Sequence, residues 1–318
     1  MEKIEHKKLQ VNGINMHIAT IGEPTKGTIL FLHGFPELWY SWRHQLLALS
    51  AAGYRAVAPD LRGFGDTDVP SSVTAYSAFH VIGDLIALLD QLGVEQVFLV
   101  GHDWGAIIAW NFVMIRGDRV KALVNLSVPF MPRNPSFKPI DGFKLAFGDD
   151  FYICRFQEPG NMEEEFSSID TVKLMKQFLV SRDPQPPVIP KGRLVGLADK
   201  IITLPLWLTE DDVNYFAEKF KQTGFTGSLN YYRCMNLNWE LTAPWTGVQI
   251  KVPTKFIIGV LDSTHNFLNI KDYLHKGGFK KDVSLLEEVV VIEGAAHFVN
   301  QERPKEISNH IQDFFAKF

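Results

Sequence analysis

The chain has 318 residues, of which 46% are hydrophobic and 21% charged, so it has enough apolar material for one large folded core. Its net charge of −4 excludes the strongly basic surface that nucleic-acid-binding proteins need. Two cysteines, Cys154 and Cys234, are too few for a disulfide framework and favour a reducing compartment.

Strands and helices alternate through the first 126 residues. Residues 7–11 and 14–20 alternate around Asn12-Gly13, which predicts a β-hairpin. Helical spacing of apolar residues follows at 42–51, 81–92 and 106–110. The continuous apolar run at 28–32 predicts a strand that is buried on both faces. Further strands are predicted at 54–58, at 97–100 and near 120–126. This order predicts an α/β protein with a mostly parallel sheet and helices on both faces.

The alternation stops at Pro129 and resumes after Pro244. Helical patterns at 172–179 and 213–220 lie among proline-rich links in this stretch. We expect an inserted helical cap over residues 130–244, on a core domain made of residues 1–129 and 245–318. The aromatic content of the cap suits the roof of an apolar pocket, although an ordinary helical subdomain would have the same composition. Strands at 254–258 and 287–292 and a helix at 307–315 complete the core.

The strand at 97–100 leads into Gly101-His102-Asp103-Trp104-Gly105, a Gly-x-Asp-x-Gly turn before an apolar helix. This is the pattern of a nucleophile elbow, in which two glycines leave room for a sharp strand-to-helix reversal. A carboxylate at its centre favours attack on saturated carbon, which gives an alkyl ester that water then hydrolyses. The alternative is that Asp103 merely caps the helix that follows.

Two further polar residues follow later strands. Asp262 comes after the strand at 254–258, and His297 comes after the strand at 287–292. Because the carboxyl ends of parallel strands meet at one edge, we expect Asp103, Asp262 and His297 to form a nucleophile–acid–histidine set. His265, on the same loop as Asp262, is a weaker candidate for the base.

Hydropathy alone marks residues 97–115 as a possible membrane span. Because His102 and Asp103 stand in its middle, a buried strand and helix are expected instead, without a membrane span. Residues 1–6 and 316–318 carry neither a secretory nor a peroxisomal signal, so a cytoplasmic location is expected. No metal-ligand spacing and no cofactor motif is visible, and a monomer is expected rather than a dimer.

Four motifs together resemble those of the α/β-hydrolase-fold soluble epoxide hydrolases: His33-Gly34-Phe35-Pro36, Gly101-His102-Asp103-Trp104-Gly105, Gly259-Val260-Leu261-Asp262 and His297-Phe298. The resemblance covers the whole chain and is strongest to the compact plant enzymes that lack an N-terminal phosphatase domain. It implies the α/β-hydrolase fold and the conversion of epoxides, aryl or fatty-acid, to vicinal diols. It also implies an alkyl ester on Asp103 that is hydrolysed by water activated by His297, which Asp262 orients.

The resemblance assigns further roles that spacing alone does not reveal. Tyr152 and Tyr232 are implied as paired cap tyrosines that bind the epoxide oxygen, with Tyr231 as the alternative to Tyr232. Their phenols suit this task because they remain protonated donors at neutral pH.

Two neighbouring segments are expected to support the ester intermediate. The backbone N–H groups of Phe35 and Trp104 are the expected oxyanion hole. The resemblance also suggests a cis Phe35–Pro36 bond. It further suggests that Glu37 and His102 support the catalytic residues from outside, although a purely structural role is an equal alternative for both.

Three other functions fit part of this pattern. A haloalkane dehalogenase shares the nucleophile, base and acid, but Phe35 offers no side-chain donor to a halide. A fluoroacetate-type dehalogenase carries arginine beside the nucleophile, where this chain has Trp104. In a ligand receptor on the same fold, an intact set of catalytic residues would have no function. Diol formation from styrene oxide, compared with halide release from bromoalkanes, separates these functions.

Overall fold

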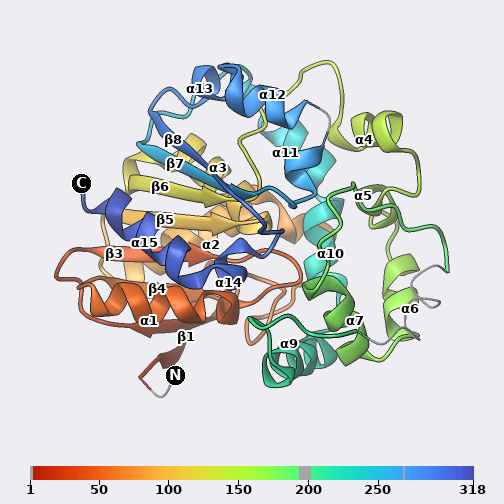
Figure 1. Ribbon diagram of the computed structural model, residues 1–318, viewed down its shortest axis with the longest axis horizontal. Helices are drawn as coiled ribbons and strands as arrows, with labels where there is room; N and C mark the ends of the chain where they lie inside the picture. Colours follow the sequence, from red (N-terminus) through yellow and green to blue (C-terminus); the bar gives the residue numbers. More distant parts are fainter. Residues whose placement is uncertain (1–2, 193–201, 268) are drawn as a thin grey trace.

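A computed structural model describes residues 3–192, 202–267 and 269–318. Its strands form one eight-stranded sheet in the order β1-β2-β4-β3-β5-β6-β7-β8 (Figure 1). The antiparallel pairs are β1–β2 and β2–β4, and the other neighbouring strands run parallel, which confirms the predicted mostly parallel sheet. The strands are β1 (Glu5–Val11), β2 (Ile14–Ile21), β3 (Thr28–Leu32), β4 (Arg55–Pro59), β5 (Val97–His102), β6 (Val120–Leu126), β7 (Thr254–Gly259) and β8 (Leu286–Ile292).

The local sequence explains the strands at the edge and the centre of the sheet. The hairpin between β1 and β2 turns at Asn12 and Gly13, whose φ angles of 44° and 83° suit a two-residue turn of the mirror-image type. Every residue of β3 and β5 is buried, because helices cover both faces of the central sheet. The continuous apolar runs at these positions therefore predicted the strands correctly.

Helices lie on both faces of the sheet (Figure 1). α1 packs against α15 on one face, and α2 packs against α3 on the other. The helices of this part are α1 (Arg43–Ala51), α2 (Ala78–Gln91), α3 (Trp104–Arg116), α12 (Ile270–His275), α13 (Gly278–Asp282), α14 (Val299–Glu302) and α15 (Pro304–Phe315). Short 3-10 helices are η1 (Trp39–Trp42), η2 (Val73–Tyr76), η3 (Gly117–Arg119), η4 (Ala243–Trp245) and η5 (Thr264–Asn266).

Between β6 and β7 the described residues form helices α4 to α11, which we call the helical insert. Its helices are α4 (Pro139–Phe147), α5 (Tyr152–Arg155), α6 (Asn161–Ser167), α7 (Thr171–Leu179), α9 (Glu210–Thr223), α10 (Thr226–Arg233) and α11 (Met235–Leu241). The helices expected at 172–179 and 213–220 are α7 and the centre of α9. α9 begins with a capping box, because Thr209 and Asp212 each accept a backbone N–H of the other. Residues 193–201 of the expected cap lie outside the described residues.

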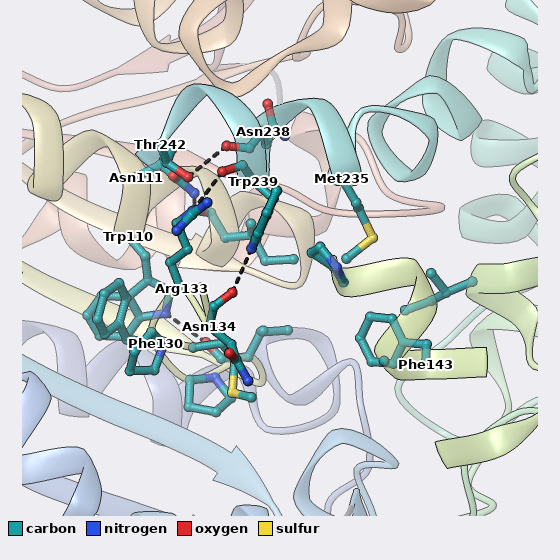
Figure 2. Close-up of a pocket in the computed structure, with 18 of the residues that line it drawn as sticks. Trp110, Asn111, Phe130, Arg133, Asn134, Phe143, Met235, Asn238, Trp239 and Thr242 are labelled. Atoms are coloured by element: carbon teal, nitrogen blue, oxygen red, sulfur yellow. Dashed lines mark hydrogen bonds between the residues drawn. The ribbon is translucent and has the colours of Figure 1, made fainter. Parts of the chain in front are cut away.

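Polar contacts join the helical insert to the core. Asp212 of α9 accepts a hydrogen bond from Tyr40 (3.0 Å) and pairs with Arg43 (3.1 Å). The Tyr231 hydroxyl of α10 donates to the Arg62 carbonyl at 2.9 Å. Between the insert and the edge of the sheet lies a cavity of about 500 Å³, lined mainly by aromatic and aliphatic side chains (Figure 2).

The apolar stretch at 97–115 forms strand β5, a turn and most of helix α3. None of the helices in the described residues combines the length and the apolar character that a bilayer crossing requires. The strand-and-helix interpretation of this stretch is therefore confirmed.

The ion pair between Arg62 and Asp84 yields a stability prediction. Both side chains are buried, and Arg62 Nε donates to Asp84 Oδ2 at 2.6 Å. Asp84→Asn keeps the shape but leaves the guanidinium uncompensated, so we expect the free energy of unfolding to fall by about 3–5 kcal/mol in denaturant titrations. Asp118→Asn, which breaks the exposed pair with Arg116, should have little effect. Equal losses in the two variants would contradict the prediction.

Candidate active site

Asp103 stands in a strained turn between β5 and α3. Its φ of 52° and ψ of −120° are rare for a residue with a side chain. A Cβ on Gly105 would lie 2.0 Å from the Leu32 carbonyl oxygen, and one on Gly101 would lie 2.5 Å from the Gly105 oxygen. Only glycine fits at both positions, as the elbow pattern predicted. The Asp103 side chain makes no capping bond to α3, so the helix-cap alternative is wrong.

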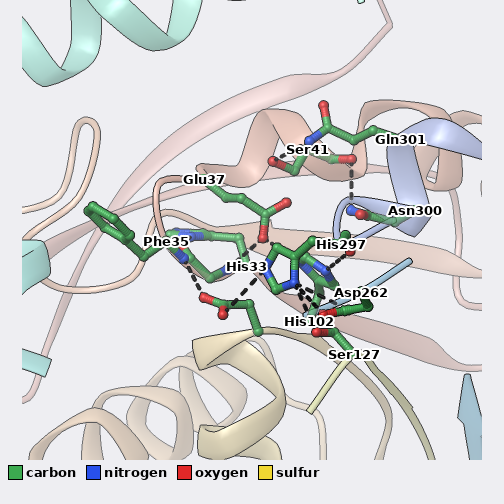
Figure 3. Close-up of polar contacts among 12 residues, drawn as sticks. His33, Phe35, Glu37, Ser41, His102, Ser127, Asp262, His297, Asn300 and Gln301 are labelled. Atoms are coloured by element: carbon green, nitrogen blue, oxygen red, sulfur yellow. Dashed lines mark hydrogen bonds and ion pairs between the residues drawn. The ribbon is translucent and has the colours of Figure 1, made fainter. Parts of the chain in front are cut away.

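The loops after β7 and β8 bring Asp262 and His297 to Asp103, and Figure 3 shows Asp262 and His297 side by side. His297 Nε2 lies 3.4 Å from Asp103 Oδ2, and His297 Nδ1 lies 3.2 Å from both carboxylate oxygens of Asp262. The structure thus brings together the three residues that strand order predicted. His265 is buried on the Asp262 loop, and Asp103 pairs with His297 instead.

The two carboxylates control the charge of His297. Burial by itself lowers the pKa of His297, but Asp262 and Asp103 outweigh it and hold this pKa well above 6.5. Burial raises the pKa of Asp262, yet the charge and hydrogen bond of His297 bring it below its usual value. The two carboxylates therefore favour the protonated, imidazolium form of His297.

Ser127 is a member of this cluster that sequence reasoning missed. Its Oγ lies 3.1 Å from His297 Nδ1, and it also lowers the pKa of Asp262 by hydrogen bonding (Figure 3). Ser127 follows the carboxyl end of β6 directly, with a φ of 72°. Its place after the carboxyl end of a central strand was the available signal in the sequence.

The loop after β3 supplies a donor to the nucleophile. The backbone N–H of Phe35 donates to Asp103 Oδ1 at 2.7 Å. A Cβ on Gly34 would lie 2.2 Å from the same oxygen, so glycine permits this close approach. The expected cis Phe35–Pro36 bond is present, and Trp104, the other expected donor, begins α3 directly after Asp103.

Glu37 and His102 form a buried pair beneath this cluster (Figure 3). His102 Nδ1 donates to Glu37 Oε2 at 2.6 Å, and His102 Nε2 donates to the His297 carbonyl at 2.7 Å. Because both ring nitrogens face acceptors, His102 is held protonated. Burial opposes both charges, but the mutual attraction lowers the pKa of Glu37 to about 2 and raises that of His102. The pair fixes the backbone that carries His297.

Tyr152 of α5 and Tyr232 of α10 line the cavity together with Asp103. Their ring centroids lie 6.0 Å apart. Burial, with the negative charge of Asp103, raises the pKa of both phenols, so their hydroxyls remain donors at neutral pH. Tyr231 points to the core instead, where its hydroxyl bonds to the Arg62 carbonyl. The structure therefore distinguishes two adjacent tyrosines that spacing did not.

One group of potential metal ligands occurs among the described residues, at His17, Asp60 and Asp66. It lies outside the residues that line the cavity. His17 Nδ1 already bonds to Asp60 Oδ2 at 2.8 Å, and Asp66 pairs with Lys219 at 2.7 Å. The potential ligand atoms of this group are therefore already bonded to other side chains of the protein.

Comparisons with known proteins all find the same fold family or epoxide hydrolases within it. Residues 27–304 match the α/β-hydrolase fold family. The chain is 63% identical to epoxide hydrolase 2 of Siraitia grosvenorii over 318 residues, which is 100% of both proteins. It is 36% identical to epoxide hydrolase A of Mycobacterium tuberculosis, over 97% of this chain and 96% of that protein. A solved structure of a mutant epoxide hydrolase from Vigna radiata is 58% identical, with a TM-score of 0.97 and 100% coverage of both chains.

The position of His297 between two carboxylates gives a prediction about its titration. Asp103→Asn removes one of the two charges that raise the pKa of His297, so this pKa should fall and the ring should lose its proton at lower pH. NMR titration of ¹³C-labelled histidine measures the midpoint. Asp141→Asn, which removes a carboxylate on α4, should leave it in place. An unchanged midpoint in Asp103→Asn would show that Asp103 does not control the charge of His297.

Proposed function

This chain belongs to the plant-type epoxide hydrolases of the α/β-hydrolase fold, and from that premise we propose that it opens epoxides through a covalent ester on Asp103. The observation that carries the proposal is the position of the Asp103 carboxylate. It lies in one cavity with two protonated phenols, and His297 Nε2 is 3.4 Å away. A nucleophile, acids for the ring oxygen and a base for water are the groups that this reaction needs.

In the first step an Asp103 oxygen attacks one epoxide carbon, and the bond from that carbon to the ring oxygen breaks. The ring oxygen takes a proton from Tyr152 or Tyr232, which both line the cavity with Asp103. Without these donors the leaving group would be a bare alkoxide, which departs poorly. The step leaves an alkyl ester, the first hydroxyl of the product and one tyrosinate.

Ester formation itself turns His297 into a base. The new ester carries no charge, so His297 loses one of the two carboxylates that raise its pKa. His297 then releases its proton, which replaces the proton that the phenol gave to the ring oxygen. Neutral His297, held by Asp262 and Ser127, can accept a proton from water.

In the second step the resulting hydroxide adds to the Asp103 ester carbonyl. The oxyanion that develops there is stabilised by the Phe35 N–H, which lies 2.7 Å from Oδ1 in the free enzyme, and by the Trp104 N–H. Collapse breaks the bond between the acyl carbon and the alkyl oxygen. The departing alkoxide takes the remaining proton of the former water, which restores ionised Asp103 and protonated His297.

We further propose that residues 130–244 act as a cap domain on a core formed by residues 1–129 and 245–318. This division is supported by the placement of both catalytic tyrosines on the helical insert and of Asp103, Asp262 and His297 on the sheet. The apolar lining of the cavity supports aryl or fatty-acid epoxides as substrates. Two free, buried cysteines support a cytoplasmic location.

Trapping of the ester tests the covalent mechanism. His297→Gln should still form the ester but hydrolyse it very slowly, since unactivated water is a poor nucleophile. Mass spectrometry of the intact protein, after reaction with styrene oxide, should find an adduct of substrate mass. The adduct should be absent from Asp103→Ala, while His265→Gln should turn over without accumulating it. Full turnover by His297→Gln would refute the assignment of the base.

The paired phenols give a second kinetic prediction. Removal of one donor from such a site typically costs about 3 kcal/mol, or roughly a hundredfold in rate. Tyr152→Phe and Tyr232→Phe should each slow ester formation by about that factor in stopped-flow experiments, and hydrolysis much less. Tyr231→Phe is the matched control, because its hydroxyl bonds to the Arg62 carbonyl and not to the cavity. A greater loss in Tyr231→Phe would reverse the assignment.

A further inference from the structure

The cavity wall carries a charge that the proposed reaction does not use. Three of the described residues that line the cavity are charged: Asp103, Arg133 and Lys138. Lys138 Nζ lies 2.8 Å from Glu240 Oε1, so its charge is neutralised within the protein. Within the described part of the chain, no carboxylate lies at ion-pair distance from Arg133. A guanidinium without a carboxylate partner, on a cavity wall whose other polar side chains are mostly uncharged, favours an anionic group on the ligand.

Arg133 is held in place from one side (Figure 2). Its Nε donates to the Trp239 carbonyl at 2.8 Å, and Nη1 donates to Thr246 Oγ1 at 2.8 Å. The guanidinium also stacks on the Trp239 ring, 4.1 Å from its centroid. Nη2 has no hydrogen-bond partner among residues 3–192, 202–267 and 269–318. A fixed guanidinium with free N–H groups is well suited to binding a carboxylate.

Helix α3 forms one wall of the cavity and gives a scale for the length of the cavity from Asp103. Asn111 lies eight residues after Asp103, about 12 Å along a helix, and both Asn111 and Arg133 line the cavity. The lining between them is apolar and includes Ile107 and Trp110. An extended chain advances about 1.2 Å per bond, so roughly ten bonds span this distance.

We propose that Arg133 is a specificity-determining residue that binds the carboxylate of an extended apolar epoxide, with the ring roughly ten bonds from the acid group. The proposal rests on the proposed function, because it concerns the orientation of substrate in the same cavity. Charge and spacing carry it. The epoxide lies between Asp103 and the two tyrosines, the alkyl chain lies along α3, and the carboxylate reaches Arg133.

Matched substrates test the proposal. The mid-chain epoxide of octadecanoic acid and its methyl ester differ in the charge of one end, and both are assayed below their aggregation concentrations. A charge-assisted hydrogen bond at a half-buried site should lower KM for the acid by about five- to thirtyfold relative to the ester, with similar kcat. Arg133→Met should abolish this ratio, and Arg133→Lys should retain part of it. Lys138→Met removes a neutralised charge from the same wall and should leave the ratio intact.

The substrate ratio separates recognition from damage to the fold, because a displaced Trp239 would raise KM for acid and ester alike. Equal KM values for acid and ester in the wild type would overturn the proposal, as would an acid preference that survives in Arg133→Met. Moving the epoxide to within a few bonds of the acid should abolish the preference. Styrene oxide, which has no carboxylate, is the separate control. If the wild type did not hydrolyse it, this result would refute the proposed function and not the role of Arg133.

Discussion

The close packing around Asp103 is the constraint on which the rest of the site depends. The turn after β5 fits against β3 only because Gly105 and Gly34 have no side chains, with the virtual Cβ of Gly105 lying 2.0 Å from the Leu32 oxygen. The same contact brings the Phe35 N–H to Asp103 Oδ1 at 2.7 Å. The nucleophile, its backbone donor and the start of α3 are therefore positioned by a single steric fit between two neighbouring parallel strands. A side chain at either glycine would displace all three together.

Around that turn the charges alternate between carboxylate and imidazole. His297 lies between Asp103 and Asp262, and the Glu37–His102 pair lies directly beside it, with the two imidazole rings 4.8 Å apart. Each buried charge is stable only because an opposite charge adjoins it. The protonation state of His297 therefore depends on Asp103, and alkylation of Asp103 changes it. In the mechanism that we propose, the first chemical step therefore prepares the base for the second.

The sequence predicted the strands and the core of the site because these depend on local patterns and chain order. The continuous apolar run at 28–32 predicted β3 with its observed bounds, a strand was predicted near the position of β6, and the order nucleophile–acid–histidine located Asp262 and His297. Tyr152 and Tyr232 needed the resemblance to a family, because nothing local distinguishes Tyr232 from Tyr231. The difference between them is a contact with the Arg62 carbonyl, 169 positions away in the chain. The sequence did not reveal the role of Ser127 for a similar reason, since its partner His297 is 170 positions away. Contacts of this kind arise from tertiary packing and leave no periodic signal.

The arrangement of the groups that act on the substrate also has a stereochemical consequence. In the proposed mechanism Asp103 attacks from the side of the sheet, and Tyr152 and Tyr232 bind the ring oxygen from the helical insert. Displacement from the face opposite the departing oxygen inverts the attacked carbon and leaves the other unchanged. The cavity extends along α3, so the two carbons of an internal epoxide meet different walls. If such an enzyme attacks both mirror-image forms of an internal epoxide at the same carbon, the two diols are again mirror images, whereas attack at opposite carbons turns both forms into the same diol.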